Sequence, residues 1–192
     1  WVGATAQAHL HGVTVQRCKA RSGGGMNLDG NVSLVDVGIE DCCTTSHLAD
    51  ALQLLDEGLL RAERVRVERA SGAYTVLLQG TSTWTDSTFI DCSRGPDITS
   101  GAHSLTRLSI RGATKYGLTA GVGSGGGVAV VIDSHIADGQ GTCVAGSQKG
   151  ALILRNVTLS TCSAPEKPYV SLGSAEAAAA FQAELLTLEP AC

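Results

Sequence analysis

The sequence predicts an all-β protein, a right-handed parallel β-helix solenoid of about seven coils. Two observations carry this prediction. A small residue recurs at intervals of 21 to 28 residues, and a glycine stands twelve residues before six of these seven anchors, with Ala6 in the glycine place of the first. Repeats of this length are typical of solenoids, in which one coil cannot bury its apolar face alone. Parallel strands are almost always joined by right-handed connections. The anchors are Cys18, Cys42, Ala70, Cys92, Ala113, Gly139 and Cys162.

Each coil is expected to begin with two short strands. Apolar residues stand eight and three residues before every anchor, as Leu34 and Ile39 do before Cys42. Alternation at a spacing of two is the mark of a strand, and the break in this alternation between positions eight and five predicts a bend. The glycine twelve residues before the anchor is expected to supply a tight turn at the start of the coil.

A third short strand is expected after each anchor, for example Met26–Leu28, Val76–Leu78 and Val170–Leu172. The length of this part varies, so insertions are confined to one side of the coil, with residues 121–127 as an inserted loop. We expect the coils to occupy residues 1–173. Residues 174–192 are predicted to form a C-terminal cap or a linker to the rest of a longer chain, with a short helix from Ser174, its N-cap, to Leu186.

Charges alternate along two columns that stacking would create, and both columns are predicted to face outward as structural ladders. Unlike charges on adjacent strands attract each other. The column six residues before the anchors contains Gly12, Asp36, Arg64, Asp86, Arg107, Asp133 and Asn156, and the column one residue before them contains Arg17, Asp41, Arg69, Asp91, Gly112, Asp138 and Thr161.

Cysteines and glycosylation signals favour the secretory route. Cys18 and Cys42 share a column in adjacent coils, which places them within disulfide reach, although a stack of buried thiols is the alternative. The five other cysteines cannot be paired from the sequence. N-glycosylation sequons start at Asn31 and Asn156. Together these features predict an extracellular or cell-surface location.

Composition argues against several classes of function. The net charge is −4 and the basic residues are paired with acidic ones, so nucleic-acid binding is not expected. No apolar run reaches the length of a membrane helix, so we expect no membrane insertion. Cys42 and Cys43 do not form a zinc motif, and the glycine-rich run at 121–127 lacks the lysine of a phosphate loop. We therefore expect neither a metal nor a cofactor.

The chain resembles the right-handed parallel β-helix proteins of the pectin-lyase-like class. Within that class, Ser22–Met26 followed by Val32–Leu34 looks like the repeat of polymorphic outer-membrane proteins, and Gly125–Val128 and Phe89–Cys92 are similar to its two elements. Cysteine replaces the asparagine of the second element. The resemblance covers residues 6–173 and implies the fold and an extracellular setting, but the class includes enzymes, adhesins and fibre proteins.

The leading functional hypothesis is a non-catalytic structural or adhesive segment of a larger extracellular or surface protein, because no catalytic set is assembled. Its partners would be other parts of the same chain, neighbouring subunits or glycans. An alternative is a carbohydrate-active or glycan-binding β-helix that uses Asp36, Asp86 and Asp133, about 10 Å apart, with Tyr74, Trp84 or Tyr116 beside them. A second alternative is an accessory subunit of a large assembly.

Overall fold

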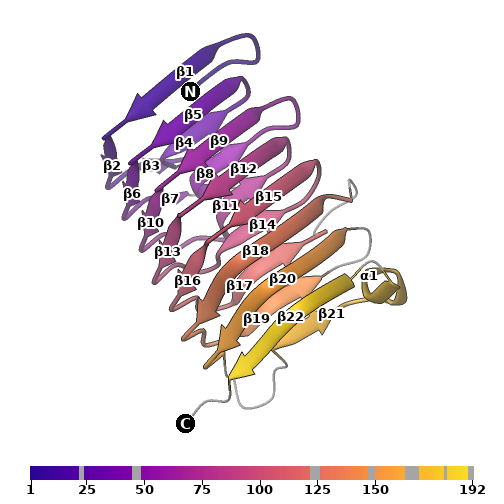
Figure 1. Ribbon diagram of the computed structural model, residues 1–192. Helices are drawn as coiled ribbons and strands as arrows, with labels where there is room; N and C mark the ends of the chain where they lie inside the picture. Colours follow the sequence, from indigo (N-terminus) through magenta and orange to yellow (C-terminus); the bar gives the residue numbers. More distant parts are fainter. Residues whose placement is uncertain are drawn as a thin grey trace.

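The computed structural model describes residues 1–21, 24–44, 49–121, 126–146, 150–162, 169–179 and 181–189. The chain forms an all-β parallel β-solenoid of about six turns and of the expected right-handed type. Successive coils stack in sequence order from one end of the molecule to the other (Figure 1). The prediction of an all-β solenoid is confirmed.

A bent sheet of thirteen strands contains the first two segments of the coils, and every pairing in it is parallel. Its shorter strands, from the second segment of the coil, are β2 (Thr14–Gln16), β6 (Gly38–Glu40), β10 (Arg66–Glu68), β13 (Thr88–Ile90) and β16 (Ser109–Arg111). The others are β1 (Gln7–His11), β5 (Asn31–Val35), β9 (Leu59–Glu63), β12 (Thr81–Thr85), β15 (Ala102–Thr106), β18 (Val128–Ala137), β20 (Ala151–Ser160) and β22 (Phe181–Glu189).

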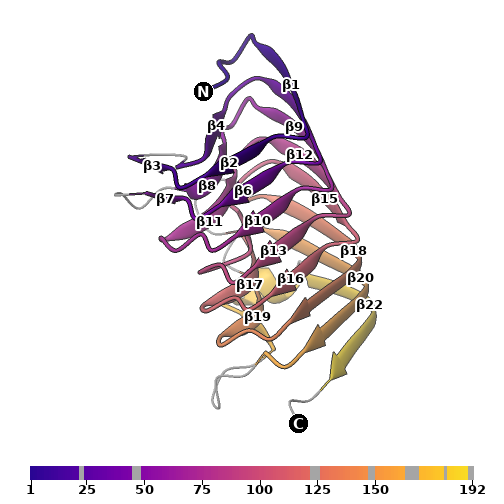
Figure 2. The ribbon, with the colours of Figure 1, turned by 90° about the vertical axis from the view of Figure 1, so that its left-hand side faces the viewer.

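A second sheet contains the third segment of the coils, as the sequence predicts, and Figure 2 shows it as another wall of the stack. Its seven strands are β4 (Met26–Leu28), β8 (Ala49–Leu54), β11 (Tyr74–Leu78), β14 (Pro96–Ile98), β17 (Tyr116–Ala120), β19 (Thr142–Gly146) and β21 (Val170–Leu172). Two short strands, β3 (Lys19–Ala20) and β7 (Cys43–Thr44), pair beside it.

The two charged columns are also the two corners of the coil. Thirteen non-glycine residues among those described have a positive φ, between 49° and 54°, and twelve of them lie in these columns. Gly12 and Gly112 occupy the same columns, also with positive φ, and Leu185 takes the first corner in the last coil. This left-handed conformation is unfavourable for most residues and tolerable for Asp, Asn and Gly, so backbone geometry explains these three residue types in the columns, whereas arginines such as Arg64 and Arg107 adopt it while they bind the aspartates of adjacent coils.

The repeated glycines have a different role from the one the sequence predicts. Of the six, Gly101 alone has a positive φ, so a left-handed backbone conformation is not the general requirement. At Gly80, an added Cβ would collide with the carbonyl oxygens of Gly58 and Leu55, and at Gly101 with the backbone of Gly80. Glycine is therefore required because the backbones of successive coils approach too closely for a side chain.

The core is a thin column of aliphatic side chains with one aromatic pair. Trp84 and Phe89 are fully buried with ring centroids 5.7 Å apart. The Trp84 Nε1–H donates to Ser82 Oγ at 3.1 Å, and Ser82 Oγ lies 2.8 Å from His103 Nδ1, while His103 Nε2 lies 2.7 Å from the Ser100 carbonyl oxygen. Trp84 thus belongs to the core and not to an outer binding face.

The C-terminal segment differs from its prediction. The helix α1 begins directly after Ser174, as predicted, but spans only Ala175–Ala179, and Phe181–Glu189 form β22, which pairs in parallel with β20. Phe181 and Leu186 align with the buried Leu152 and Val157, so the inward apolar pattern of the coil continues. The helix prediction through Leu186 was wrong because this two-residue period, broken at the corner, overrides the alanine-rich start.

Candidate functional site

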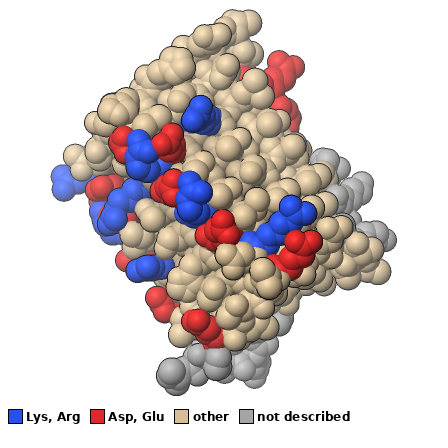
Figure 3. Space-filling model, viewed as in Figure 1, with Lys and Arg blue, Asp and Glu red and all other residues tan. Residues whose placement is uncertain are grey.

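The predicted carboxylates of the first corner column each bind a neighbour in an adjacent coil. The Arg64 guanidinium donates to both carboxylate oxygens of Asp36 (Nε–Oδ1 2.6 Å, Nη2–Oδ2 3.0 Å), and Arg107 does the same to Asp86 (2.6 and 2.8 Å). Asp133 Oδ1 accepts a hydrogen bond from Asn156 Nδ2 at 2.8 Å. The second corner repeats this pattern, with Arg69 on Asp41 at 2.7 and 3.1 Å. Basic and acidic side chains accordingly lie side by side in Figure 3.

These pairs keep the carboxylates ionised. The hydrogen bonds from Arg64 and Arg107 lower the pKa of Asp36 and of Asp86 below the ordinary value, and they raise the pKa of both arginines. A general acid needs the opposite shift. The geometry therefore supports the interpretation of the column as a structural ladder rather than a catalytic set.

The cysteines pair differently from the expectation. Cys143 on β19 and Cys162 form a disulfide with a Cα–Cα distance of 5.4 Å, whereas Cys18 and Cys42 are free. Burial raises the pKa of the Cys42 thiol to about 11, which favours the protonated thiol. The anchor columns could not reveal Cys143 because it lies in the variable third segment of its coil. The predicted Cys18–Cys42 bridge is thus replaced by one near the other end of the solenoid.

The two sequon asparagines are both exposed. Asn31 begins β5, and Asn156 occupies a corner with a φ of 51°. Asn156 uses one amide hydrogen on Asp133, so its second remains for another bond. Glycosylation stays a prediction at both positions.

The outer face of the seven-stranded sheet is the part of the described chain where polar groups are left without partners. Four buried side-chain atoms of the described residues have no hydrogen-bond partner, and all four lie on or beside this sheet: Asn27 Oδ1, Asp50 Oδ2, Arg94 Nε and Asp97 Oδ2. Buried polar groups are normally satisfied, so each exception calls for an explanation. This face is consequently the best candidate for a functional surface.

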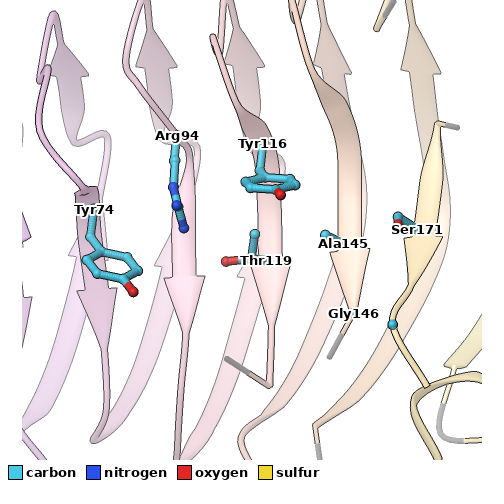
Figure 4. A pocket seen from close by; sticks show the side chains of 8 residues that line it. Tyr74, Arg94, Tyr116, Thr119, Ala145, Gly146 and Ser171 are labelled. Atoms are coloured by element: carbon cyan, nitrogen blue, oxygen red, sulfur yellow. The ribbon is translucent and has the colours of Figure 1, made fainter. Parts of the chain in front are cut away.

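Arg94 and Asp97 form the centre of that surface. The Arg94 guanidinium lies between two tyrosine rings, its Cζ 4.9 Å from the Tyr74 centroid and 5.2 Å from the Tyr116 centroid (Figure 4). Its Nη1 donates to Asp97 Oδ1 at 3.2 Å, and Thr119 Oγ1 also donates to that oxygen. The sheet register explains the arrangement, because Arg94 pairs with Tyr116 and Asp97 with Thr119.

Burial dominates the electrostatics of Asp97. Its side chain is completely inaccessible, and the loss of hydration raises its pKa to about 6 despite the opposing effects of Thr119 and Arg94. Burial also raises the pKa of Asp50, which accepts hydrogen bonds from Thr44 N and Oγ1 at 2.7 and 2.9 Å. Perturbed carboxyl groups of this kind concentrate at functional sites.

A pocket of about 330 Å³ opens beside the tyrosines. Tyr74, Arg94 and Tyr116 line it toward the middle of the solenoid, and the small residues Ala145, Gly146 and Ser171 line it farther along, from strands β19 and β21. It therefore crosses several strands, with aromatic and cationic groups at one end and a floor of small residues at the other (Figure 4). Its volume suits a small ligand or part of a chain.

Two serine–histidine contacts lie outside this pocket, and neither forms an assembled catalytic site. Ser82 and His103 are 3% exposed or less, and burial lowers the pKa of His103, so this pair is a polar contact within the core. His135 Nε2 lies 2.7 Å from Ser160 Oγ, but Ser160 is buried. Among the described residues, no three His, Cys, Asp or Glu side chains could hold a metal ion. The same part of the chain contains no helix that is long and apolar enough to cross a membrane.

No known protein-family model matches the chain, and its sequence matches no curated protein significantly. The resemblance to the pectin-lyase-like class and to polymorphic outer-membrane-protein repeats thus finds support in the parallel β-solenoid fold alone.

Sequence reasoning named Tyr74 and Tyr116 as candidate stacking residues but placed them beside the wrong carboxylates, and it missed Arg94 and Asp97. Tyr74, Arg94 and Tyr116 stand four, two and three residues after their anchors. Because this segment varies in length, its residues cannot be aligned into columns before the strand register is known.

Proposed function

We propose that the chain is a non-catalytic structural or adhesive β-solenoid segment of a larger extracellular or cell-surface protein. The observation that carries this proposal is the corner ladder, in which Asp36 and Asp86 are held by arginines from adjacent coils and Asp133 by Asn156. Side chains engaged in stacking one coil on another contribute rigidity rather than chemistry. Expected partners are other parts of the same protein, neighbouring subunits or glycans.

Two features support the extracellular part of the proposal. The Cys143–Cys162 disulfide is typical of proteins in oxidising compartments. Both sequon asparagines are exposed, as glycosylation requires. Intact mass of the protein from its natural source, before and after reduction and N-glycosidase treatment, tests this directly. A fully reduced chain without glycans would contradict an extracellular location.

Deletion of one coil tests the structural proposal. Removing residues 80–100 joins Gln79 to Gly101 and takes out one repeat of 21 residues, so the remaining coils stay in register. We expect a shortened protein that unfolds cooperatively. Removing only residues 80–89 is the matched control and should prevent folding, because it breaks the register. Cleavage of an acidic polysaccharide by the intact protein that disappears in Asp86→Asn would contradict the non-catalytic proposal.

A specific observation favours glycan binding as a second candidate function. Tyr116 lines the pocket together with Arg94 and the hydroxyls of Thr119 and Ser171, and flat rings combined with hydroxyl and guanidinium donors suit a sugar ring. This site lies on the second sheet and not on the corner column with Asp36, Asp86 and Asp133, where the sequence placed it.

Tyrosine substitutions test the glycan candidate. In a titration with a panel of neutral and acidic oligosaccharides, Tyr116→Ala should abolish binding, while Tyr116→Phe should retain most of it because the ring remains. Equal binding by both variants would show that the Tyr116 ring is not the platform, and the candidate site would then be wrong.

A further inference from the structure

An aspartate–arginine ion pair lies beside the pocket, and its neighbours do not satisfy all of its hydrogen-bonding atoms. Asp97 is inaccessible to solvent, whereas the Arg94 side chain is 19% exposed and lines the pocket. Asp97 Oδ2 and Arg94 Nε both lack a partner, although each residue makes one contact with the other. The hydrogen bond between Asp97 and Arg94 can therefore change without the loss of further hydrogen bonds at these two atoms.

We propose that Asp97 is a positioning residue that acts through Arg94 and sets the net charge of the pocket. With Asp97 ionised, the pair is neutral and the guanidinium is held between Tyr74 and Tyr116. With Asp97 protonated, the positive charge of Arg94 is uncompensated and becomes available to an anionic group, such as a carboxylate or a sulfate. This inference rests on the proposal that the pocket binds a ligand.

Few other charges act on Asp97. On its own segment the charged neighbour is Arg94. From β11 the side chain at its register position is Leu77, with the phenol of Tyr74 nearby on Arg94, and from β17 it meets Thr119, with the phenol of Tyr116 on the other side of Arg94. Among the described residues that face Asp97, Arg94 is therefore the charged one, and protonation of Asp97 leaves the charge of Arg94 uncompensated.

The tyrosines keep the guanidinium at the pocket in both states. Cation–π contact with two rings holds Arg94 even when Asp97 is neutral, because the attraction does not depend on the carboxylate. A carboxylate or sulfate approaching from the pocket would then find a preformed, weakly hydrated guanidinium on a side chain that is 19% exposed. The direction of the effect follows: anions bind more tightly at acidic pH.

Inorganic sulfate is the first probe, followed through the ¹H–¹⁵N resonance of Arg94 Nε at constant ionic strength. In the wild-type protein this resonance should shift with pH with a midpoint near 6, and sulfate should bind at least roughly tenfold more tightly at pH 5 than at pH 7.5. In Asp97→Asn the resonance should be independent of pH, and sulfate should bind equally at both pH values. Asp36→Asn is the matched control, an acidic residue with an arginine partner outside the pocket, and should behave like the wild type.

Thr119→Val provides a second variant that leaves the carboxyl in place. The Thr119 hydroxyl lowers the pKa of Asp97, so its loss should move the midpoint upward. A resonance unaffected by pH in the wild type, or unchanged pH dependence in Asp97→Asn, would overturn the inference. Equal sulfate binding at both pH values would overturn it even if oligosaccharides bind. If the sulfate pattern holds and no oligosaccharide binds, the glycan function alone is refuted.

Discussion

The coil of residues 80–100 contributes to two regions of opposite character. At its first corner, Asp86 is half exposed and its carboxylate is satisfied by Arg107 of the next coil. On the seven-stranded sheet, Asp97 is fully buried and one of its oxygens has no partner. The corner repeats along the whole stack, whereas the tyrosine–arginine–aspartate cluster occurs within three coils. Repetition with satisfied bonds indicates a structural role, and a local, unsatisfied cluster indicates a site.

The largest effect should come from the core that supports both regions. Trp84 is fully buried in the same coil, and Trp84→Ala removes its ring contact with Phe89 and its bond to Ser82. We expect a loss of about 3–5 kcal/mol in the free energy of unfolding. Urea titration measures it, with Trp84→Phe as the control that keeps most of the volume. A loss below about 1 kcal/mol in the alanine variant would mean that the coil is not tightly packed around Trp84.

Removal of the disulfide should destabilise the pocket end of the seven-stranded sheet more than the corner pairs of the first coils. Cys143 lies on β19, the strand that also contributes Ala145 and Gly146 to the pocket, and its bond to Cys162 closes a loop of 19 residues. Cys143→Ser should lower the free energy of unfolding by about 3 kcal/mol. Hydrogen exchange should then increase in β19 and β21 more than at the corner pairs of the first coils. Cys92→Ser, at a buried free cysteine, is the control.

The two regions should also depend on pH with opposite signs. The pKa of Asp97 rises from 3.8 to about 6 on folding, so between these values the native state binds more protons than the unfolded state. Stability contributed by the protonated form is present at low pH and is lost as pH rises through 6, by about 3 kcal/mol in all. Relative to the wild type, Asp97→Asn should gain most of this amount between pH 4 and pH 7 in urea titrations. A difference that does not change with pH would mean that Asp97 titrates normally.

The sequence predicted the stacked architecture well because the columns obey fixed spacings. Leu34 and Ile39 before Cys42 are buried at the positions that the repeat assigned to the core. The sequence predicted a glycine requirement at position 80 but attributed it to a tight turn, because a close approach of two backbones also requires glycine. In both cases the same residue type recurs at a fixed position because each coil imposes the same structural requirement there.

The candidate site could not be predicted in the same way because it depends on pairs that do not repeat. Arg94, Asp97 and Thr119 are brought together by the register of β14 and β17, which follows a segment of variable length. The disulfide partner Cys143 belongs to such a segment as well. A residue that occurs once, in a segment whose alignment between coils is unknown, cannot be assigned a neighbour until the strand pairing is known.

The smallest effect on stability is expected at the corner ladder, and its pH dependence has the opposite sign to that of Asp97. Arg107 lowers the pKa of Asp86, so the stability from this pair is present above pH 4 and is lost as pH falls through the lowered pKa. Because the pair is exposed, Arg107→Met should destabilise the protein only slightly at neutral pH, and less at high salt.

Two substitutions of Asp86 at the same corner should differ because of backbone strain. Asp86 has a φ of 52°, which asparagine tolerates and valine does not. In urea titrations at pH 7, Asp86→Val should therefore destabilise more than Asp86→Asn, although both remove the charge. Equal losses would mean that the ion pair, and not the corner conformation, selects the aspartate. The ladder would then be an electrostatic device first, and its alternation of charge rather than its backbone geometry would account for the repeat.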